Sequence, residues 1–323
     1  MIFNSFFIIL LKLLKDTQKT AFGLFKIMIP ISILVKGMEY FGFIAVLGNI
    51  LKPIMKIMGL PGEIGIVWAT TMISNIYGGM LVYAEMYKIL QLTEAQITIM
   101  CGLMLVAHTL PVELRVAQKA GCHIFTMFFI RFGFAILSGI VMNLLFSYFN
   151  ILQNSGPSEV ALIHKMPVNT VPDWLLQELQ FYLKVTFYVF CLLSLMQILK
   201  TIGIIELISR ILHPILSTLG ISKAVIPITV IGSTLGILYG GALIIKESEE
   251  KELRKMDVFY AMTLMGLCHS LIEDSILMMS LGASILGVFV FRMCFAYLIT
   301  LIIVKISKKL PQKLQEKILT SVT

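Results

Sequence analysis

Long apolar segments alternate with short polar breaks along this chain. Apolar segments of about 20 residues recur at six places, near residues 20–40, 95–118, 122–149, 179–200, 258–281 and 284–305. A helix needs about 20 apolar residues to cross the roughly 30 Å hydrocarbon core of a bilayer. The pattern therefore predicts an all-α integral membrane protein with six crossing helices.

The two halves of the chain repeat one another. At an offset of 161 residues His108 aligns with His269 and Arg131 aligns with Arg292, and at 162 YGGMLVYAE aligns with YGGALIIKE. Each half carries three predicted crossings, and a repeat with an odd number of crossings must point the opposite way to its partner. The sequence therefore predicts two inverted repeats.

Each half also contains apolar segments that are not expected to cross. A short amphipathic segment interrupted by proline occurs in both, as GNILKPIMKIMG and as ILHPILSTLG, and is predicted to lie along the membrane surface. Two apolar arms follow, each too short to cross the bilayer alone. They predict a re-entrant hairpin over residues 62–91, which turns at SNIYGG, and a second hairpin that turns near Tyr239.

These features divide the chain into five predicted parts. They are an N-terminal amphipathic helix at 1–19, a first repeat at 20–149, an external linker at 150–178, a second repeat at 179–305 and a basic cytoplasmic tail at 306–323. Polar Pro, Asn and Ser residues mark the linker. The N-terminal segment has its basic residues after its apolar run, the reverse of a signal peptide.

Composition and charge narrow the class of protein. Hydrophobic residues make up 58% of the chain and charged residues 14%, which excludes a soluble enzyme. The net charge of +8 does not indicate nucleic-acid binding, because most Lys and Arg residues fall on one face of the predicted topology. That face is expected to be cytoplasmic. We therefore predict a multi-pass plasma-membrane protein with both termini in the cytoplasm and the lipid bilayer as its surroundings.

Several chemical motifs do not occur in the sequence. The five cysteines form no CxxC pair, and neither HExxH nor GxxxxGK[ST] is present. These motifs would indicate a metal or redox site, a metalloprotease and an ATPase, respectively. The sequence thus favours a protein that is not an enzyme and predicts no cofactor.

Histidine and carboxylate residues within two predicted spans are the first candidates for a site. AHTLPVELR carries His108 and Glu113, and CHSLIED carries His269, Glu273 and Asp274. A charged group at the centre of a bilayer costs at least about 2.5 kcal/mol and marks a function by default. Proline at position 111 should unwind the first span alone, so that His108 and Glu113 can face a common point. His269 and Glu273 are four residues apart and share a face of a regular helix without unwinding. A structural hydrogen-bond network is the alternative.

The hairpin turns are the second candidates. Adjacent glycines let the backbone approach a solute closely, and the ends of half-helices offer oriented backbone groups. The alternative is close helix packing through small residues. The candidate solute-binding positions are Ser74, Asn75, Gly78, Gly79, Gly240 and Gly241.

Two arginines are expected to lie near the middle of their spans. Arg131 and Arg292 are too deep to reach water easily, so each should pair with a carboxylate or with carbonyls exposed by the broken spans. We predict that both have a structural role.

The segments AHTLPVE and CHSLIEDS, the two YGG strings and the order of surface helix and hairpin resemble the nucleoside-recognition, or Gate, domain family. The resemblance extends from about residue 20 to 305 and is strongest to stand-alone prokaryotic membrane proteins. Gate domains also occur in the membrane part of ferrous-iron transporters, and they resemble the core of concentrative nucleoside transporters. The resemblance implies transport, with hairpin tips and broken spans around the solute.

The sequence therefore predicts a permease for a small polar or cationic solute that works by alternating access. A divalent metal ion and a nucleoside-like molecule both remain open, and so does a homo-oligomer. The alternative is a membrane assembly or regulatory subunit that transports nothing. Balanced charges within the spans, which a structural network would also contain, keep that alternative open.

Overall fold

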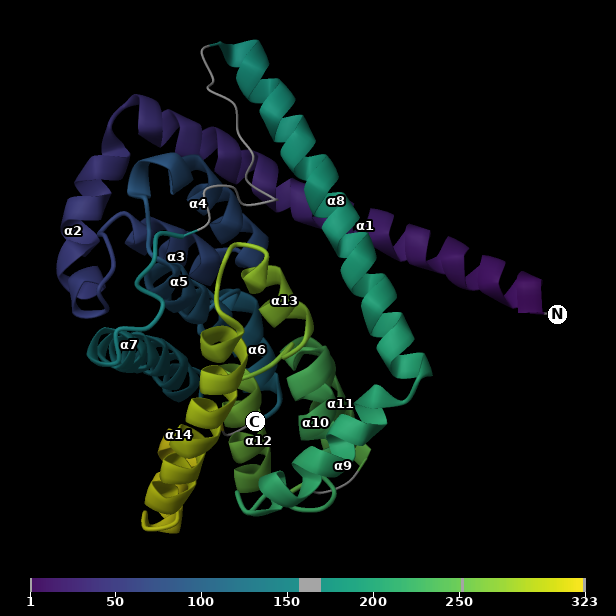
Figure 1. Cartoon of the computed structure of the whole chain (residues 1–323). Coiled ribbons are helices and arrows are strands. Elements are labelled where there is room, and N and C mark those ends of the chain that lie inside the picture. The colour runs from purple at the N-terminus through teal and green to yellow at the C-terminus, as the bar shows by residue number, and fades with distance from the viewer. Residues whose placement is uncertain (1, 157–169, 251–252, 322–323) are drawn as a thin grey trace.

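The computed structural model describes residues 2–156, 170–250 and 253–321, which form helices and no β-strand (Figure 1). The fold class predicted from the sequence, all-α and membrane-integral, is confirmed. The helices of the first half are α1 (Ile2–Tyr40), α2 (Phe43–Ile57), α3 (Ile64–Ile73), α4 (Ile76–Leu90), α5 (Glu94–Val106), α6 (Leu110–Lys119) and α7 (Ile124–Tyr148).

The second half contains the same order of elements. They are α8 (Val171–Thr201), α9 (Ile204–Ser217), α10 (Ile226–Leu235), α11 (Ile237–Glu250), α12 (Lys255–Leu267), α13 (Glu273–Met279), the π-helical segment η1 (Leu286–Phe291), α14 (Arg292–Ser307) and the C-terminal α15 (Gln312–Ile318). The inverted orientation of the two halves stays a prediction.

Four helical segments in the described part of the chain are long and apolar enough to cross a membrane. They are Glu94–Lys119, Ile124–Tyr148, Pro172–Leu199 and Leu286–Ser307. Four of the six predicted crossings correspond to these segments. The predicted crossing at 258–281 is divided between α12 and α13, and the predicted crossing at 20–40 forms part of α1.

The N-terminal part of the chain is simpler than predicted. The expected surface helix at 1–19 and the expected span from residue 20 belong to one helix, α1, which contacts α8 (Figure 1). Polar residues in the sequence indicate a boundary there, but lysine and threonine are compatible with a helix and no proline precedes Pro30. Of the predicted linker, 157–169 lie outside the described residues, and α8 already begins at Val171.

Matched glycines end the corresponding elements of the two halves. Gly42 and Gly203 have φ of 72° and 75°, and Gly121 and Gly282 have φ of 100° and 97°. Backbone with positive φ strongly favours glycine, because a Cβ would clash with the backbone there. The alignment found in the sequence therefore corresponds to the same local backbone at these positions.

The two predicted hairpins are present as pairs of short helices. The helices α3 and α4 contact one another and reverse at Ser74 and Asn75, and α10 and α11 reverse at Gly236. The sequence predicted the second turn near Tyr239, and the observed reversal lies three residues earlier. Gly236 has a φ of 109°, which explains why the chain turns at this glycine.

A capping box begins α5. The Gln96 backbone N–H donates to Thr93 Oγ1 at 3.2 Å, and the Thr93 N–H donates to Gln96 Oε1 at 3.1 Å. These bonds satisfy two backbone donors that would otherwise lack partners at a helix start.

We expect Thr93→Ala to lower the free energy of unfolding by about 0.5–2 kcal/mol, the usual cost of losing such a cap. Thr93→Ser keeps the hydroxyl and should stay close to wild type. Thermal unfolding in detergent measures both variants. Equal losses for the two would show that the hydroxyl is not the stabilising group.

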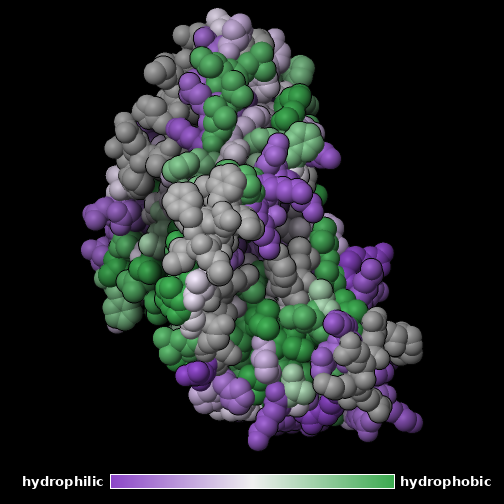
Figure 2. All heavy atoms as spheres, turned by 90° about the vertical axis from the view of Figure 1, so that its right-hand side faces the viewer, coloured by the Kyte–Doolittle hydropathy of each residue, from purple (hydrophilic) through white to green (hydrophobic). Residues whose placement is uncertain are grey.

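Apolar side chains cover much of the outer surface. Phe22, Phe125, Phe129 and Leu183 are each more than 60% exposed, whereas the interior contains buried Met, Leu and Ile side chains. Figure 2 shows hydrophobic residues over much of one face, with hydrophilic residues along its lower end and in smaller groups higher up. Exposed apolar surface of this extent fits contact with lipid.

Candidate functional site

Both broken spans interrupt their helices at matched positions. The first break lies between Val106 and Leu110, and the second between Leu267 and Glu273. Thr109 and Ser270, which align in the repeat, both have left-handed backbone, with φ of 49° and 46°. Such conformations are uncommon outside glycine and occur where the surroundings enforce them.

The expectation that only the first span unwinds is wrong. Proline at position 111 accounts for a helix start at Leu110, but the second span unwinds without a proline. The reason lies in the tertiary hydrogen bonds at the breaks. The Thr109 N–H donates to the Thr71 carbonyl at 3.0 Å, and the Leu271 N–H donates to the Ser233 carbonyl at 3.1 Å. Each hairpin thus satisfies a backbone donor that the break frees.

Two histidines from opposite halves of the chain meet between these breaks. His108 Nε2 lies 3.1 Å from His269 Nε2, and Glu113 Oε1 lies 3.3 Å from both of these nitrogens. The three residues are 6%, 2% and 4% exposed, in that order. The predicted convergence of His108 and Glu113 therefore occurs, and it includes His269 as well.

The carboxylate that contacts His269 differs from the one expected. The sequence favoured Glu273, four residues further along a regular helix, but the chain unwinds between the two residues. Glu113 from the other half contacts His269 instead. Asp274, which aligns with Glu113 in the repeat, lines the same cavity as the histidine pair.

Arg131 binds both the carboxylate and the first break. Its Nη1 lies 2.5 Å from Glu113 Oε2. Its Nε and Nη2 donate to the Val106 carbonyl at 3.0 and 2.9 Å, and Nη2 also donates to the His108 carbonyl at 3.3 Å. Both kinds of partner predicted for this arginine are therefore present in the structure.

Arg292 repeats the carbonyl contacts in the second half. Its Nη2 donates to the His269 carbonyl at 2.7 Å and to the Leu105 carbonyl at 3.5 Å, and its Nε donates to the Leu267 carbonyl at 3.4 Å. Within the described ranges it forms no ion pair with a carboxylate. The two arginines thus donate hydrogen bonds to carbonyls at equivalent breaks. Of the two, Arg131 also forms an ion pair, with Glu113.

A cavity of about 230 Å³ joins the two hairpin tips to the two breaks. This volume is below the roughly 300 Å³ at which most small-molecule pockets begin, so it suits a small solute or an ion. The lining residues are Asn75, Ile76, Tyr77, His108, Thr109, Glu113, Leu235, Gly236, Ile237, His269, Ser270 and Asp274.

The paired glycines of the hairpins have a different position from the one proposed for solute binding. Gly78, Gly79, Gly240 and Gly241 lie inside α4 and α11, and they are not among the lining residues. A Cβ on Gly79 would overlap Thr71 Oγ1, and a Cβ on Gly240 would lie 2.5 Å from the Gly232 Cα. Close packing of the hairpin arms, the alternative reading, explains these glycines.

Of the remaining candidates, Asn75 lines the cavity whereas Ser74 and Glu273 do not. The side chain of Asn75 also caps α4, since its Oδ1 accepts from the Gly78 N–H at 2.8 Å.

Sequence reasoning missed several lining residues. Thr109 and Ser270 flank the histidines in the aligned segments, so their matched positions were a usable signal. Tyr77, at a position where an aromatic residue more often serves in packing, also lines the cavity. No periodic pattern distinguishes such a residue from the packed residues around it, because it lies at the very start of a short helix.

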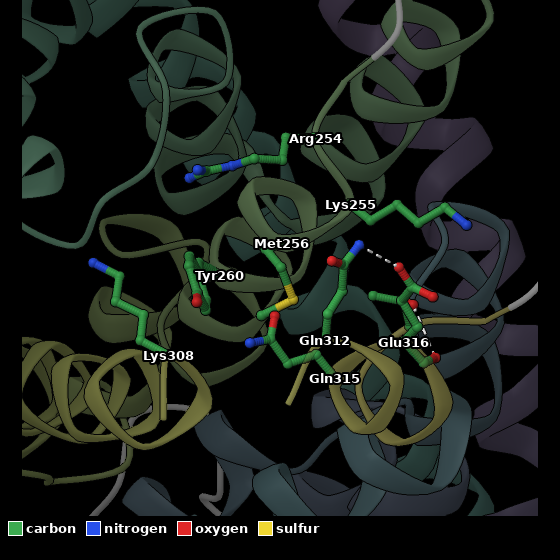
Figure 3. A pocket seen from close by; sticks show the side chains of 9 residues that line it. Arg254, Lys255, Met256, Tyr260, Lys308, Gln312, Gln315 and Glu316 are labelled. Carbon is green, nitrogen blue, oxygen red and sulfur yellow. Dashed lines mark hydrogen bonds between the residues drawn. The ribbon is translucent and has the colours of Figure 1, made fainter. Parts of the chain in front are cut away.

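A second cavity, of about 440 Å³, lies where α12 meets α15, away from the histidine pair. Arg254, Lys255 and Lys308 give its lining a basic character (Figure 3). Gln312 Nε2 donates to Glu316 Oε1 at 3.0 Å beside it. Its charged groups are borne by long side chains at the surface, in contrast to the buried cluster of the central cavity.

Comparison with known proteins gives one full-length relative. The chain is 27% identical over 300 residues to YvoD, an uncharacterized membrane protein of Bacillus subtilis (strain 168). The aligned region covers 90% of this chain and 92% of that protein. No solved structure matches the chain.

The match to a family model covers much of the first half. It begins within α1 and ends within α7, and it therefore includes the first hairpin, the first break, Glu113 and Arg131. The resemblance inferred from the sequence is confirmed over this region. The family is associated with membrane transport rather than with enzymes. Residues 21–142 of this membrane protein match the Gate family, which is described as nucleoside recognition.

Proposed function

We propose that this protein is a permease that moves a small polar or cationic solute across the plasma membrane by alternating access. The observation that carries the proposal is the cavity between the two breaks and the two hairpin tips, which the breaks and Asn75 of the first tip line with polar side chains. Polar groups inside a membrane protein are costly and mark solute or ion pathways. The match to the Gate family supports the same conclusion.

The arrangement of the site suits alternating access. His108 and Glu113 come from the first half, whereas His269 and Asp274 come from the second. In transporters built from inverted repeats, movement of one repeat against the other opens a shared site to either side in turn. A solute held by both halves would then be released when they separate. Both termini lie in the cytoplasm in this proposal.

Purified full-length protein in liposomes tests the proposal directly. Flux of nucleosides, small organic ions and divalent metal ions is measured separately, each against protein-free liposomes. Protein-dependent, saturable flux of any one of these supports a permease. Absence of flux for all three classes would overturn it.

We expect His108→Ala and His269→Ala each to reduce this flux by about 10-fold or more, because loss of a buried hydrogen-bonding partner costs about 1–3 kcal/mol. The free energy of unfolding should fall by less than about 2 kcal/mol, since the Arg131–Glu113 pair remains. His213→Ala is the matched control, because His213 is exposed on α9. Histidine variants that unfold before they lose flux would identify the pair as a structural network.

One observation favours a second function, that of a non-transporting assembly or regulatory subunit. Glu113 is already neutralised by Arg131, as expected for a purely structural network. Affinity purification from the native membrane distinguishes the two functions. A single stoichiometric partner, together with absence of flux, would favour the subunit.

A further inference from the structure

Three hydrogen-bond acceptors converge in the central cavity. His108 Nε2, His269 Nε2 and Glu113 Oε1 are separated by 3.1, 3.3 and 3.3 Å. Each residue offers one ligand atom, and all three residues are buried. Such a cluster needs an electropositive partner, because three lone pairs at this separation repel one another.

The other ring nitrogens determine which protons the histidines carry. His108 Nδ1 lies 3.1 Å from the Met104 carbonyl, and His269 Nδ1 lies 2.7 Å from the Met265 carbonyl. A carbonyl oxygen can only accept, so each Nδ1 carries its hydrogen. In a neutral imidazole the Nε2 atom is then a bare acceptor. Both Nε2 atoms therefore present lone pairs to the space that they share with Glu113.

This arrangement is typical of metal-binding histidines. Such residues usually donate their second N–H to a carbonyl or carboxylate, which fixes the tautomer and the orientation of the ring. Here the carbonyl acceptors belong to the last turns of α5 and α12, immediately before the two breaks. The breaks thus aim the two imidazoles at one another across the boundary between the halves.

The separations also fit a metal ion. Zinc binds histidine nitrogen and carboxylate oxygen at about 2.0–2.2 Å, which places tetrahedral ligands about 3.3–3.5 Å apart. The observed separations agree with these within a few tenths of an ångström. Imidazole ligands favour first-row transition metals over Mg²⁺ and Ca²⁺, which prefer oxygen. Arg131 contacts Glu113 Oε2, which leaves the other carboxylate oxygen, Oε1, to face the two histidines.

We propose that His108 Nε2, His269 Nε2 and Glu113 Oε1 form a binding site for a divalent first-row transition metal, shared between the two halves of the chain. Occupation of the site is a property of the folded protein alone. That the ion is the transported solute rests on the permease function proposed above. Because each half supplies one histidine, separation of the halves would dismantle the site and release the ion.

Titration of the full-length protein in detergent with Co²⁺ tests the site, since Co²⁺ bound by nitrogen and oxygen ligands absorbs visible light. Wild-type protein should bind one equivalent, and Zn²⁺ should displace it. His108→Ala and His269→Ala should each weaken binding by more than 100-fold, beyond the 10–100-fold typical of losing a mere supporting residue. His213→Ala should bind as wild type does.

Glu113→Gln should weaken binding in the same way. This variant leaves Arg131 without its carboxylate and could fail to fold for that reason. In that case the two histidine variants alone test the metal site. Absence of saturable Co²⁺ binding by wild type would overturn the proposal. Unchanged affinity in both histidine variants would do so as well.

Binding and transport can fail separately. Co²⁺ binding without flux of Co²⁺, Zn²⁺ or any other solute would leave the metal site standing and overturn the permease. Nucleoside flux without Co²⁺ binding would overturn the metal site and leave the permease standing. In that case the cation between the acceptors is a proton on one of the histidines.

Discussion

Arg131→Ala is expected to lower the free energy of unfolding by about 3–5 kcal/mol, the typical cost of removing one member of a buried ion pair. Arg131 is 1% exposed, and its removal leaves the Glu113 carboxylate buried without a cation. It also leaves the Val106 carbonyl at the first break without its donors. Unfolding in detergent, followed by the fraction of monodisperse protein, measures the loss.

Arg292→Ala is the matched variant and should lose less, about 1–3 kcal/mol. It removes hydrogen bonds to two carbonyls at the second break, Leu267 and His269, and to the Leu105 carbonyl of α5, but it leaves no ion-paired carboxylate without its partner. The sequence predicted a structural role for both arginines and did not distinguish them. The structure predicts unequal effects. Within the described residues, Arg131 forms an ion pair with a carboxylate and Arg292 forms none.

A double variant identifies the cause. If the stranded charge dominates, adding Glu113→Gln to Arg131→Ala should restore part of the lost stability, since an amide is less costly to bury than a carboxylate. A double variant no more stable than Arg131→Ala would assign the loss to the carbonyls instead. Arg131→Lys should be intermediate, because it keeps the charge without the planar fork.

Gly240→Ala is expected to have the second large effect, a loss of about 3 kcal/mol. A Cβ at this position would lie 2.5 Å from the Gly232 Cα and 2.6 Å from Met265 Sδ. The Gly232 contact is with backbone, so no side-chain rotation relieves it and the arms of the second hairpin must separate. Separation would also displace Gly236 at the hairpin tip, and we therefore expect flux to fall together with stability.

Two comparisons sharpen this test. Gly133→Ala in α7 meets no atom within 4 Å and should be neutral or stabilising by up to about 1 kcal/mol. In the first hairpin, a Cβ on Gly79 overlaps the Thr71 side chain rather than backbone. Thr71→Ala should therefore partly rescue Gly79→Ala. Wild-type stability in Gly240→Ala would contradict the close approach of α10 and α11.

The sequence by itself determined the membrane class, most of the crossing helices, the two hairpins and the position of the first break. Each of these depends on local properties, such as the length of an apolar segment, the presence of proline or glycine, and the need of backbone groups for partners. The alignment of His108 with His269 and of Arg131 with Arg292 also came from the sequence. It established that these residues are equivalent, but not that they meet.

Only the tertiary structure decided which groups share the site. His269 contacts Glu113 of the other half rather than Glu273 of its own, and Tyr77 reaches the cavity while Gly79 and Gly240 pack between hairpin arms. A helical period specifies which residues share a face of one element, and it contains no information on what that face meets. The second break also depends on tertiary structure. No proline causes it, and the Leu271 N–H that it frees donates to the Ser233 carbonyl of the second hairpin.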